Sequence, residues 1–455
     1  MHDELDIVVL AAGKGTRMRS RLPKVLHPLA GKPMVRHVLD TAAGLNPQRT
    51  QVVIGHGAEA MREALAEQAV HFCLQAEQKG TGHAVAQALE QLGHGKVLVL
   101  YGDVPLIRRE TLAALLARVD DQHMGLLTVE MENPDGYGRI KRDAAGSAVA
   151  IVEQKDASPS ELTLTECNTG IMAMTAAQLK RWMPRLSDDN AQGEYYLTDV
   201  IAMAAADGVT VATAQPASTV EVQGVNNRAQ MAELERACQR ARAERLMADG
   251  VALADPARID VRGSLTCGHD VFIDVGCVFE GDVSLGEGVR VGPYCVLKNA
   301  TVGAESVIES HSVLEQCVAA GRNAIGPYAR LRPGTRLAVA ARVGNFVETK
   351  NVDVGEASKI NHLSYVGDAT VGRDVNIGAG TITCNYDGAN KHRTHIDDDA
   401  FIGSNSALVA PVSVGRGATV GAGSTIARDV ADKALGITRA PQREKANWPR
   451  PNKRD

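Results

Sequence analysis

The fold of the C-terminal half is decided by residues 394–430, which read THIDDDAFIGSNSALVAPVSVGRGATVGAGSTIARDV. Aliphatic side chains recur in this stretch at every sixth position, namely Ile396, Ile402, Leu408, Val414, Val420 and Ile426. A period of six fits neither an α-helix, which has about 3.6 residues per turn, nor a single strand, in which side chains alternate. It is typical of a parallel β-helix, in which each hexapeptide forms one flat face of a three-faced coil and sends one aliphatic side chain inward.

The same spacing extends towards the middle of the chain, with small shifts of phase. Its earlier members are Ile273, Phe279, Leu285, Val291, Leu297; Val302, Ile308, Leu314; Ile325, Leu331, Leu337, Val343; Val354, Ile360, Val366; and Val371, Ile377. Small residues such as Gly403 and Gly421 often follow the aliphatic one, and they suit tight corners. Ile259 to Ile426 would form about nine coils, which is far too regular for chance periodicity in a chain rich in valine and glycine.

Length, net charge and cysteine content limit the number of domains and the kinds of partner and site that we expect. The chain has 455 residues, which predicts two or three domains, and a net charge of -5, which argues against general nucleic-acid binding. Its eight cysteines form no CxxC pair, so neither a zinc site nor a disulfide framework is indicated. The acidic start and the short apolar run after it fit neither a signal peptide nor a membrane span. We therefore expect a cytoplasmic protein without nucleic-acid or membrane partners.

The first half alternates strand-like and helix-like segments. We expect strands at 7–12, 52–54, 71–74 and 96–101, and helices at 34–43, 58–69 and 82–92. This order predicts an α/β domain with a mainly parallel sheet. An amphipathic pattern predicts one connecting helix from about Arg228 to Asp249, closed by Gly250. The expected domains are residues 1–228, a linker helix at 229–249, and residues 250–455.

A glycine loop follows the first strand and reads LAAGKGTR from Leu10 to Arg17. Its backbone N–H groups could hold phosphates, although it matches neither the P-loop nor G-x-G-x-x-G, and such a loop alone is as often structural. Arg17 and Lys24 could neutralise phosphate charge, or they are solvated surface charges. Asp103 stands where a buried strand ends, which suits a magnesium ligand, a helix N-cap or a turn.

Taken together, the motifs resemble those of a known family. They are LAAGKGTRM with Pro23-Lys24 downstream, Gly80-Thr81, YGD at 101–103, GYGR at 136–139, NTG at 168–170, GEYY at 193–196 and GVNN at 224–227. The combination resembles the sugar-nucleotide pyrophosphorylases, and over nearly the whole chain it is similar to the bacterial bifunctional N-acetylglucosamine-1-phosphate uridylyltransferases / glucosamine-1-phosphate N-acetyltransferases. The resemblance implies an enzyme of UDP-N-acetylglucosamine synthesis that supplies peptidoglycan and lipopolysaccharide precursors. It also implies a Rossmann-like nucleotidyltransferase domain, a left-handed β-helix, and a homotrimer with acetyl-CoA sites between subunits.

For the first domain, the resemblance implies a nucleotide and sugar site with catalytic cations. It assigns UTP to Leu10, Ala11, Ala12, Gly13, Gln75, Gly80, Thr81, Tyr101, Gly102 and Asp103, and the sugar to Gly138, Glu153 and Asn168. Arg17 and Lys24 would act on phosphates, and Asp103 with Asn226 would bind Mg²⁺. A sugar 1-phosphate would then attack the α-phosphorus of UTP in line and expel pyrophosphate, with catalysis by positioning and charge neutralisation.

The second domain carries candidates for acetyl transfer. The longest break in the six-residue period lies between Ile377 and Ile396, and insertions in solenoids map to loops that often bind ligands. An amine that attacks a thioester needs a base, and His362 is the candidate, although a lone histidine on such a face is more often plain surface. The resemblance assigns the sugar phosphate to Arg332, Lys350, Tyr365 and Asn376, and acetyl-CoA to Ala379, Asn385, Tyr386, Ser404, Ala422 and Arg439. No motif pairs Cys384 with a base, so an acyl-cysteine is not expected.

Three other hypotheses remain open from the sequence. In the first, only the nucleotidyltransferase is active and the β-helix assembles or regulates, but such a solenoid needs neither His362 nor the loop at 385–391. In the second, the chain is a trimeric scaffold, which the combination of Lys24, Asp103 and Asn226 argues against. In the third, the β-helix holds a metal between histidines, yet His269, His311 and His362 show no regular spacing. One residue and one segment stand outside these assignments. Thr349 occupies an expected apolar position, and the basic tail 443–455 is a frayed end or an arm near an anion.

Overall fold

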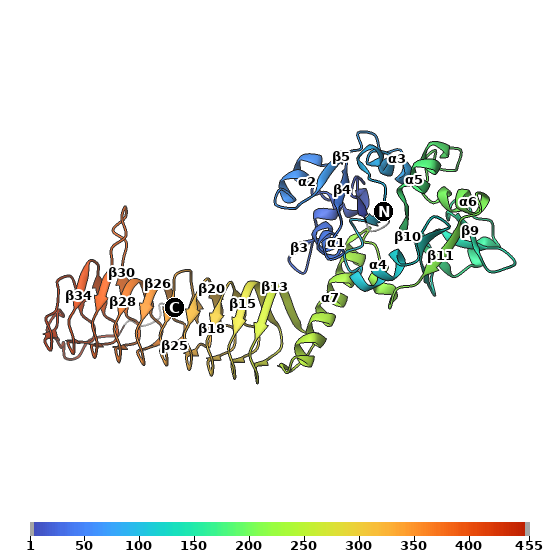
Figure 1. Ribbon diagram of the computed structural model, residues 1–455. Helices are drawn as coiled ribbons and strands as arrows, with labels where there is room; N and C mark the ends of the chain where they lie inside the picture. Colours follow the sequence, from blue (N-terminus) through green and yellow to red (C-terminus); the bar gives the residue numbers. More distant parts are fainter. Residues whose placement is uncertain (1–3, 451–455) are drawn as a thin grey trace. The chain divides into compact units, whose positions relative to one another are not determined.

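The computed structural model describes residues 4–450, and the chain divides into two compact units, 1–238 and 239–455 (Figure 1). The first unit is built on a nine-stranded sheet whose central order is β11-β7-β10-β6-β1-β4-β5. The strands are β1 (Leu5–Leu10), β4 (Arg49–Ile54), β5 (His71–Leu74), β6 (Lys96–Tyr101), β7 (His123–Glu130), β8 (Arg139–Arg142), β9 (Ala148–Val152), β10 (Glu166–Thr175) and β11 (Thr210–Ala214). A two-stranded ribbon of β2 (Pro28–Leu29) and β3 (Lys32–Pro33) lies outside this sheet.

The sheet is mainly parallel, but the long strand β10 and the short strand β9 run in the opposite direction, which the sequence pattern did not reveal. β1, β4, β5 and β6 run parallel to one another, whereas β10 is antiparallel to both β6 and β7. An antiparallel strand has the same apolar composition as a buried parallel one, so its direction could not be read from the sequence.

Helices cover both faces of this sheet and form a three-layer α/β unit. They are α1 (Met34–Ala43), α2 (Ala58–Ala64), α3 (Thr81–Ala86), α4 (Arg109–Leu116), α5 (Ala176–Trp182) and α6 (Asp199–Ala206). Alternate residues of β1 enter two separate cores: Ile7 and Val9 pack with α1, α2 and α4, while Val8 and Leu10 pack with α3, α5 and α6. The expected helix at 34–43 and the strands at 71–74 and 96–101 are confirmed, but two expected helices are too long, because α2 ends at Ala64 and α3 at Ala86.

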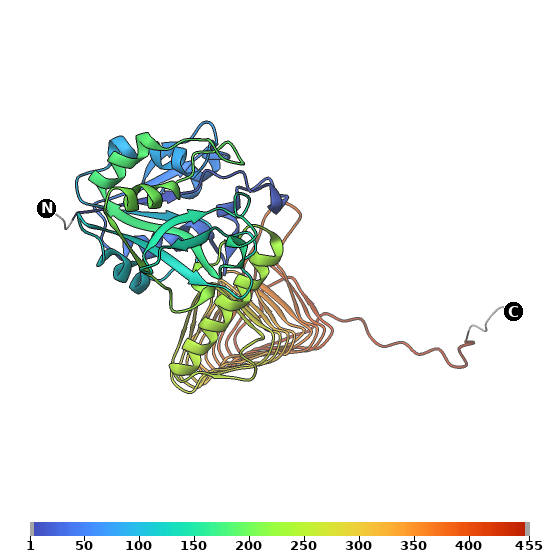
Figure 2. The same ribbon diagram turned by 90° about the vertical axis from the view of Figure 1, so that its right-hand side faces the viewer.

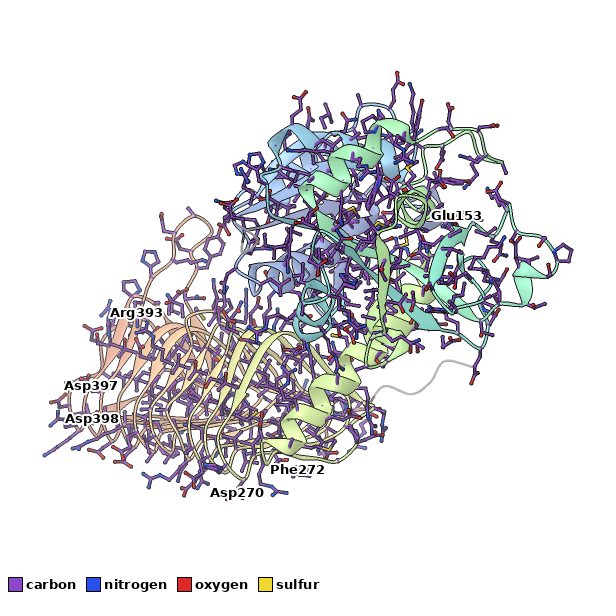
Figure 3. The ribbon with its side chains drawn as sticks, turned by 45° about the vertical axis from the view of Figure 1, so that its right-hand side comes forward. Glu153, Asp270, Phe272, Arg393, Asp397 and Asp398 are labelled. Carbon is purple, nitrogen blue, oxygen red and sulfur yellow. The ribbon has the colours of Figure 1, made fainter. Side chains whose placement is uncertain are left out.

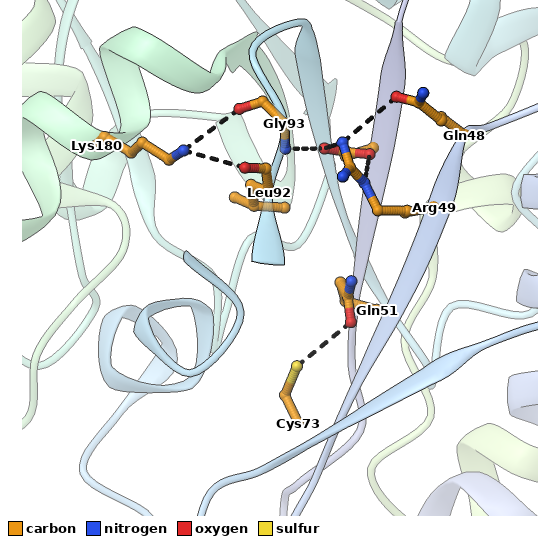
Figure 4. A network of polar contacts seen from close by, with 8 residues as sticks. Gln48, Arg49, Gln51, Cys73, Leu92, Gly93 and Lys180 are labelled. Atoms are coloured by element: carbon orange, nitrogen blue, oxygen red, sulfur yellow. Dashed lines mark hydrogen bonds and ion pairs between the residues drawn. The ribbon is translucent and has the colours of Figure 1, made fainter. Parts of the chain in front are cut away.

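Ion pairs and hydrogen bonds connect the amino-terminal ends of the strands (Figure 4). Asp6 is 2% exposed, accepts hydrogen bonds from Nε of Arg49 at 2.9 Å and from the N–H of Gly93 at 2.6 Å, and so has both oxygens satisfied. Nζ of Lys180 binds the carbonyls of Leu92 and Gly93. The amino-terminal ends of the strands are therefore connected by internal contacts, and the cleft described below lies at their carboxyl ends.

The expected connecting helix is confirmed as α7 (Arg228–Ala248). In the second unit, the Gln239 side chain donates to the carbonyl of Val261 at 3.0 Å and accepts from its N–H at 2.8 Å. The helix is thereby tied to the backbone of the first coil. Within residues 4–450, no helix combines the length and apolar character needed to cross a bilayer.

The second unit is a parallel β-helix with triangular coils, seen almost end-on in Figure 2. One face forms an 11-stranded parallel sheet of β12 (Ala252–Leu253), β14 (Phe272–Ile273), β16 (Arg290–Val291), β19 (Val307–Ile308), β22 (Ala324–Ile325), β25 (Arg342–Asn345), β27 (Lys359–His362), β29 (Asn376–Ile377), β32 (Phe401–Ile402), β35 (Thr419–Val420) and β37 (Leu435–Gly436).

The other two faces share a 15-stranded sheet. Its strands are β13 (Ile259–Cys267), β15 (Cys277–Leu285), β17 (Val296–Lys298), β18 (Thr301–Val302), β20 (Val313–Glu315), β21 (Val318–Ala319), β23 (Arg330–Leu331), β24 (Arg336–Leu337), β26 (Glu348–Val354), β28 (Tyr365–Val371), β30 (Ile382–Cys384), β31 (Thr394–Ile396), β33 (Ala407–Val409), β34 (Val412–Val414) and β36 (Thr425–Ile426). The stack is longer than the expected nine coils, because β12 precedes Ile259 and β37 follows Ile426. The sense of the coil stays a prediction.

The six-residue period predicted the core of this unit. Every aliphatic residue of the period, from Ile273 to Ile426, is buried in one continuous cluster. Thr349 also points inward, between Leu331 and Val366, and its hydroxyl lies 3.1 Å from that of the buried Thr335. The two hydroxyls satisfy each other, which explains how a polar residue occupies a core position.

Candidate functional sites

A cleft of about 730 Å³ lies at the carboxyl ends of β1, β5 and β6, where ligands of open α/β sheets bind. The N–H of Gly102 donates to the carbonyl of Leu10 at 2.9 Å, which joins the loops after β6 and β1. Twelve predicted residues line this cleft: Leu10, Ala11, Ala12, Gly13, Arg17, Lys24, Gln75, Gly80, Thr81, Tyr101, Asp103 and Asn226.

The glycine loop positions Lys24. Gly15 has a φ of +58°, and a Cβ there would lie 2.6 Å from Cβ of Lys24, so a larger residue would push the lysine away. A Cβ on Gly13 would meet nothing within 4 Å, and Gly13 itself is exposed and lines the cleft. Packing against Lys24 therefore requires glycine at position 15 but not at position 13.

Three of the four polar side chains assigned to phosphate and metal, those of Lys24, Asp103 and Asn226, contact one another. Nζ of Lys24 forms an ion pair with Oδ2 of Asp103 and lies 3.2 Å from Oδ1 of Asn226. The N–H of Val225 donates to the carbonyl of Asp103 at 3.0 Å, which brings Asn226 beside the end of β6. Two oxygen ligands thus converge on one cation. Asp103 is not a helix N-cap, because α4 begins six residues later with Arg108 at its N-cap.

The start of α7 holds Asn226 in place. The side chain of Asn227 accepts from the N–H of Gln230 at 2.9 Å, and the side chain of Gln230 accepts from the N–H of Asn226 at 2.8 Å. Gln230 also lines the cleft, and it was not among the predicted residues. An asparagine followed three residues later by glutamine is a capping signal that could have identified this position.

The loop that contains Tyr195 packs against Gly80 and Thr81. Gly80 has a φ of +104°, and a Cβ there would lie 2.5 Å from the carbonyl oxygen of Tyr195. The N–H of Gly82 donates to that carbonyl at 2.8 Å, and Oγ1 of Thr81 accepts from the N–H of Leu197 at 3.0 Å. The GEYY motif therefore packs against the start of α3, and its Glu194 lines the cleft.

Four predicted residues are not among those that line the cleft: Gly102, Gly138, Glu153 and Asn168. Three of them lie together, because the N–H of Asn168 donates to the carbonyl of Gly138 at 2.8 Å and a Cβ on Gly138 would lie 3.4 Å from the Glu153 carboxylate. Glu153 follows β9 (Figure 3) and accepts from Oγ1 of Thr198 at 3.2 Å. Burial raises the pKa of Glu153 above its ordinary value.

The cleft has other lining residues that the predictions missed. They include Lys14, Gln78, Asp135, Tyr137, Thr169, Glu194 and Gln230. Lys14, Tyr137, Thr169 and Glu194 stand within the quoted motifs, so their sequence neighbours were the available signal. Gln78 and Asp135 carry no motif and became visible only when the loops were folded together.

In the second unit, His362 belongs to a column of residues on successive coils. Strand pairing places Asn345 opposite His362, and it aligns Ile360, Ile377, Ile402 and Val420. Two residues beyond these aliphatic positions stand His362, Ala379, Ser404 and Ala422. Arg439 Nη1 donates to the carbonyl of Ala422 at 2.9 Å. The base candidate and four residues assigned to acetyl-CoA therefore follow one edge of the solenoid, and Asn376 lies on the Ala379 coil.

Cations gather across the corner from His362. Arg332 and Lys350 follow the paired residues Leu331 and Thr349 on adjacent coils, and Arg332 binds Glu348 at 2.8 Å. The neighbouring ammonium of Lys391 lowers the pKa of Lys350 below its ordinary value. Like charges held side by side are costly unless an anion joins them, so this is a candidate site for a phosphate.

A polar column supports the loop that carries Lys391. Asp368 accepts from Asn351 at 2.6 Å and also from Asn385, whose Nδ2 lies 3.4 Å from the hydroxyl of Tyr365. The loop projects from the coils after β30, and Arg393 anchors its return through the carbonyl of Ala369 (Figures 1 and 3). Tyr386 stands on this loop and is 60% exposed.

The cysteines show no arrangement for catalysis. All eight are free thiols, and burial raises the pKa of Cys277 to about 11 and that of Cys295 to about 12. Within residues 4–450, no group of three or more His, Cys, Asp or Glu side chains could hold a metal ion. The described part of the basic tail, up to Arg450, is exposed and contains no helix or strand, and its last five residues lie outside the described ones.

Comparison with known proteins gives matches over both units. Residues 7–181 match the MobA-like NTP transferase domain family, and residues 393–428 match the bacterial transferase hexapeptide (six repeats) family. A protein of Chromohalobacter salexigens called "Bifunctional protein GlmU" is 68% identical over 99% of both chains. Proteins of the same name from Marinobacter nauticus and Alkalilimnicola ehrlichii are each 58% identical, over 99% and 100% of this chain and 99% and 98% of their own.

Proposed function

Because the chain belongs to the bifunctional GlmU family, as an N-acetylglucosamine-1-phosphate uridylyltransferase and glucosamine-1-phosphate N-acetyltransferase, we propose a separate chemical role for each of its two sites. The family assignment gives the product, UDP-N-acetylglucosamine, a precursor of the cell wall. The roles of individual residues are the proposal. It rests on the convergence of Lys24, Asp103 and Asn226 in one cleft and of His362 with its column in the other unit.

In the first site, UTP lies along the glycine loop with its phosphates near Arg17 and Lys24. The phosphate oxygen of N-acetylglucosamine 1-phosphate attacks the α-phosphorus, and the bond to pyrophosphate breaks as the new one forms. Lys24 and Arg17 balance the charge that spreads over the phosphate oxygens, and Gly138, Glu153 and Asn168 orient the sugar. No residue forms a covalent intermediate.

The residues present also fit a magnesium ion. Asp103 offers a carboxylate and Asn226 an amide oxygen, and both already meet one positive charge, the ammonium of Lys24. Magnesium is held in enzymes by one or two such oxygens together with substrate phosphates. When bound, Mg²⁺ would neutralise phosphate charge. The contribution of the protein is to hold the two oxygens at the end of β6.

In the second site, His362 takes a proton from the amine of glucosamine 1-phosphate as the nitrogen attacks the thioester carbonyl of acetyl-CoA. The C–S bond then breaks and the CoA thiolate is protonated. Arg332, Lys350, Tyr365 and Asn376 hold the sugar phosphate, and Asn385 and Ser404 lie near the thioester. Ala379, Tyr386, Ala422 and Arg439 complete the acetyl-CoA site.

The proposal extends to assembly and location. We expect a cytoplasmic homotrimer with acetyl-CoA bound between subunits and without nucleic-acid or membrane partners. Support comes from the family and from the stacked coils, which present long regular edges suited to association. Sedimentation of the purified chain tests it, because a monomer at micromolar concentration would contradict the trimer.

The deciding experiment is a mass-spectrometric assay of the purified chain with glucosamine 1-phosphate, acetyl-CoA, UTP and Mg²⁺, each omitted in turn. UDP-N-acetylglucosamine should appear only when all four are present. Added N-acetylglucosamine 1-phosphate should replace the first two components. If it is needed even in the full mixture, the β-helix has no acetyltransferase activity and serves assembly alone.

A further inference from the structure

The side chain of Asn345 contacts the ring of His362. Oδ1 of Asn345 lies 2.9 Å from Nδ1 of His362, on adjacent coils. An amide oxygen only accepts hydrogen bonds, so this contact requires a proton on Nδ1. In the neutral ring, Nε2 then keeps the free lone pair.

The other hydrogen bonds of His362 involve its backbone, and among the described residues only Asn345 forms a hydrogen bond with its ring. The carbonyl of His362 accepts from Oγ of Ser364 at 2.7 Å and from the N–H of Gly380 at 3.3 Å. Within residues 4–450, Nε2 of His362 has no hydrogen-bond partner, and the residue is exposed. Nε2 is therefore open to a substrate.

Two local features bring Asn345 this close. A Cβ on Gly344 would lie 2.0 Å from the carbonyl oxygen of Asn361, so only glycine lets the end of β25 approach β27 there. The carbonyl of Asn345 accepts from the N–H of Leu363 at 3.1 Å, which fixes its backbone in register with His362.

We propose that Asn345 is a positioning residue for acetyl transfer, which holds His362 in the Nδ1–H tautomer and aims Nε2 at the substrate amine. This inference rests on the proposed role of His362 as the base. Asn345 does not touch the reacting atoms; it acts by keeping the ring in the one state that can accept the proton. Partners of this kind, when removed from metal-bound histidines, cost about 10- to 100-fold in function.

The test compares steady-state acetyl transfer by full-length Asn345→Leu and Asn345→Asp. Leucine keeps the size but removes the acceptor, so kcat should fall about 10- to 100-fold while both KM values stay within about twofold. Aspartate keeps an acceptor and should hold kcat within about threefold of the unmodified chain. An unchanged kcat in Asn345→Leu, or equal losses in both variants, overturns the inference. Loss only in Asn345→Asp would mean that the amide contact is dispensable and that the added negative charge impairs the site, and would overturn the inference as well.

A double variant separates this inference from the role of His362. Asn345→Leu should add no further loss to His362→Ala, because the two residues act as one unit. A further loss in the double variant would contradict the positioning role. If His362→Ala keeps full acetyl transfer, the assignment of His362 as the base is wrong. If His362→Ala is inactive but Asn345→Leu is fully active, only the positioning role of Asn345 is wrong. Thermal unfolding of the same preparations controls for folding of the β-helix, and Asn345→Ala replaces the leucine variant if that control fails.

Discussion

Nζ of Lys24 forms an ion pair with Oδ2 of Asp103, although 79 residues separate them in the chain. Both side chains are 15% exposed, and both residues line the cleft. A cation beside this carboxylate is part of the resting structure. The arrangement gives the first prediction.

Asp103→Ala should abolish uridylyl transfer while leaving acetyl transfer intact. The substitution removes the carboxylate that receives positive charge at the end of β6, and we expect a loss of at least about a hundredfold in kcat/KM, or about 2.7 kcal/mol. The measurement is pyrophosphate release across a magnesium titration. The milder Asp103→Asn keeps the shape of the side chain and controls for collapse of the cleft. Retained magnesium-dependent transfer in the alanine variant would refute the metal role.

His362→Ala should have the converse effect. Without a base on the edge of the solenoid, acetyl transfer to glucosamine 1-phosphate should fall by about 10²- to 10⁴-fold, because general-base catalysis contributes about that much. Uridylyl transfer from added N-acetylglucosamine 1-phosphate should be unchanged, since His362 lies in the other unit. The matched control is His311→Ala, an exposed corner residue stacked on Tyr328. Equal loss of both activities in His362→Ala would contradict the two-site assignment.

Glu153→Gln should stabilise the protein and weaken the sugar site. Burial raises the pKa of Glu153, so its charged form is costly above that pKa and the cost disappears as the pH falls towards its ordinary value of 4.5. The glutamine variant should therefore raise the thermal midpoint by about 2 °C at neutral pH and by less in acid, with a higher KM for the sugar phosphate.

Glu166 serves as the control for this prediction, because its pKa is shifted in the opposite direction. Burial of Glu166 alone would raise its pKa, but hydrogen bonds from Arg142, at 2.7 Å from each oxygen, lower it on balance. Its charge therefore adds stability at neutral pH that is lost as the pH falls through its lowered pKa. Glu166→Gln should lower the thermal midpoint at neutral pH. If both variants shift the midpoint in the same direction, the burial argument for Glu153 fails.

Thr335 and Thr349 point inward, and we expect substitution of both to cost less stability than substitution of Thr349 alone. Each is fully buried, and their hydroxyls lie 3.1 Å apart. Thr349→Val leaves the hydroxyl of Thr335 without a partner and should cost about 1–3 kcal/mol, whereas Thr335→Val with Thr349→Val should be nearly neutral. Thermal midpoints of the two single variants and the double variant measure the coupling. Additive losses would mean that the hydroxyls do not depend on each other.

The sequence by itself determined the solenoid. A side chain at every sixth position can reach a common core only if each hexapeptide forms one face, and all residues of the period are buried as expected. The order of segments in the first half likewise predicted an α/β unit, and twelve of the residues that the family resemblance assigned line the cleft at the carboxyl ends of the strands.

Only the tertiary structure decided which distant groups touch. The contact of Lys24 with Asn226 spans 202 residues, the antiparallel course of β10 follows from its neighbours in the sheet, and Gln78 and Asp135 entered the cleft without a motif. Asn345 meets His362 because strand register places residues 17 apart on adjacent coils. Periodicity records which side chains face inward. Pairing across the fold depends on register and loop geometry, which many distant backbone contacts fix together.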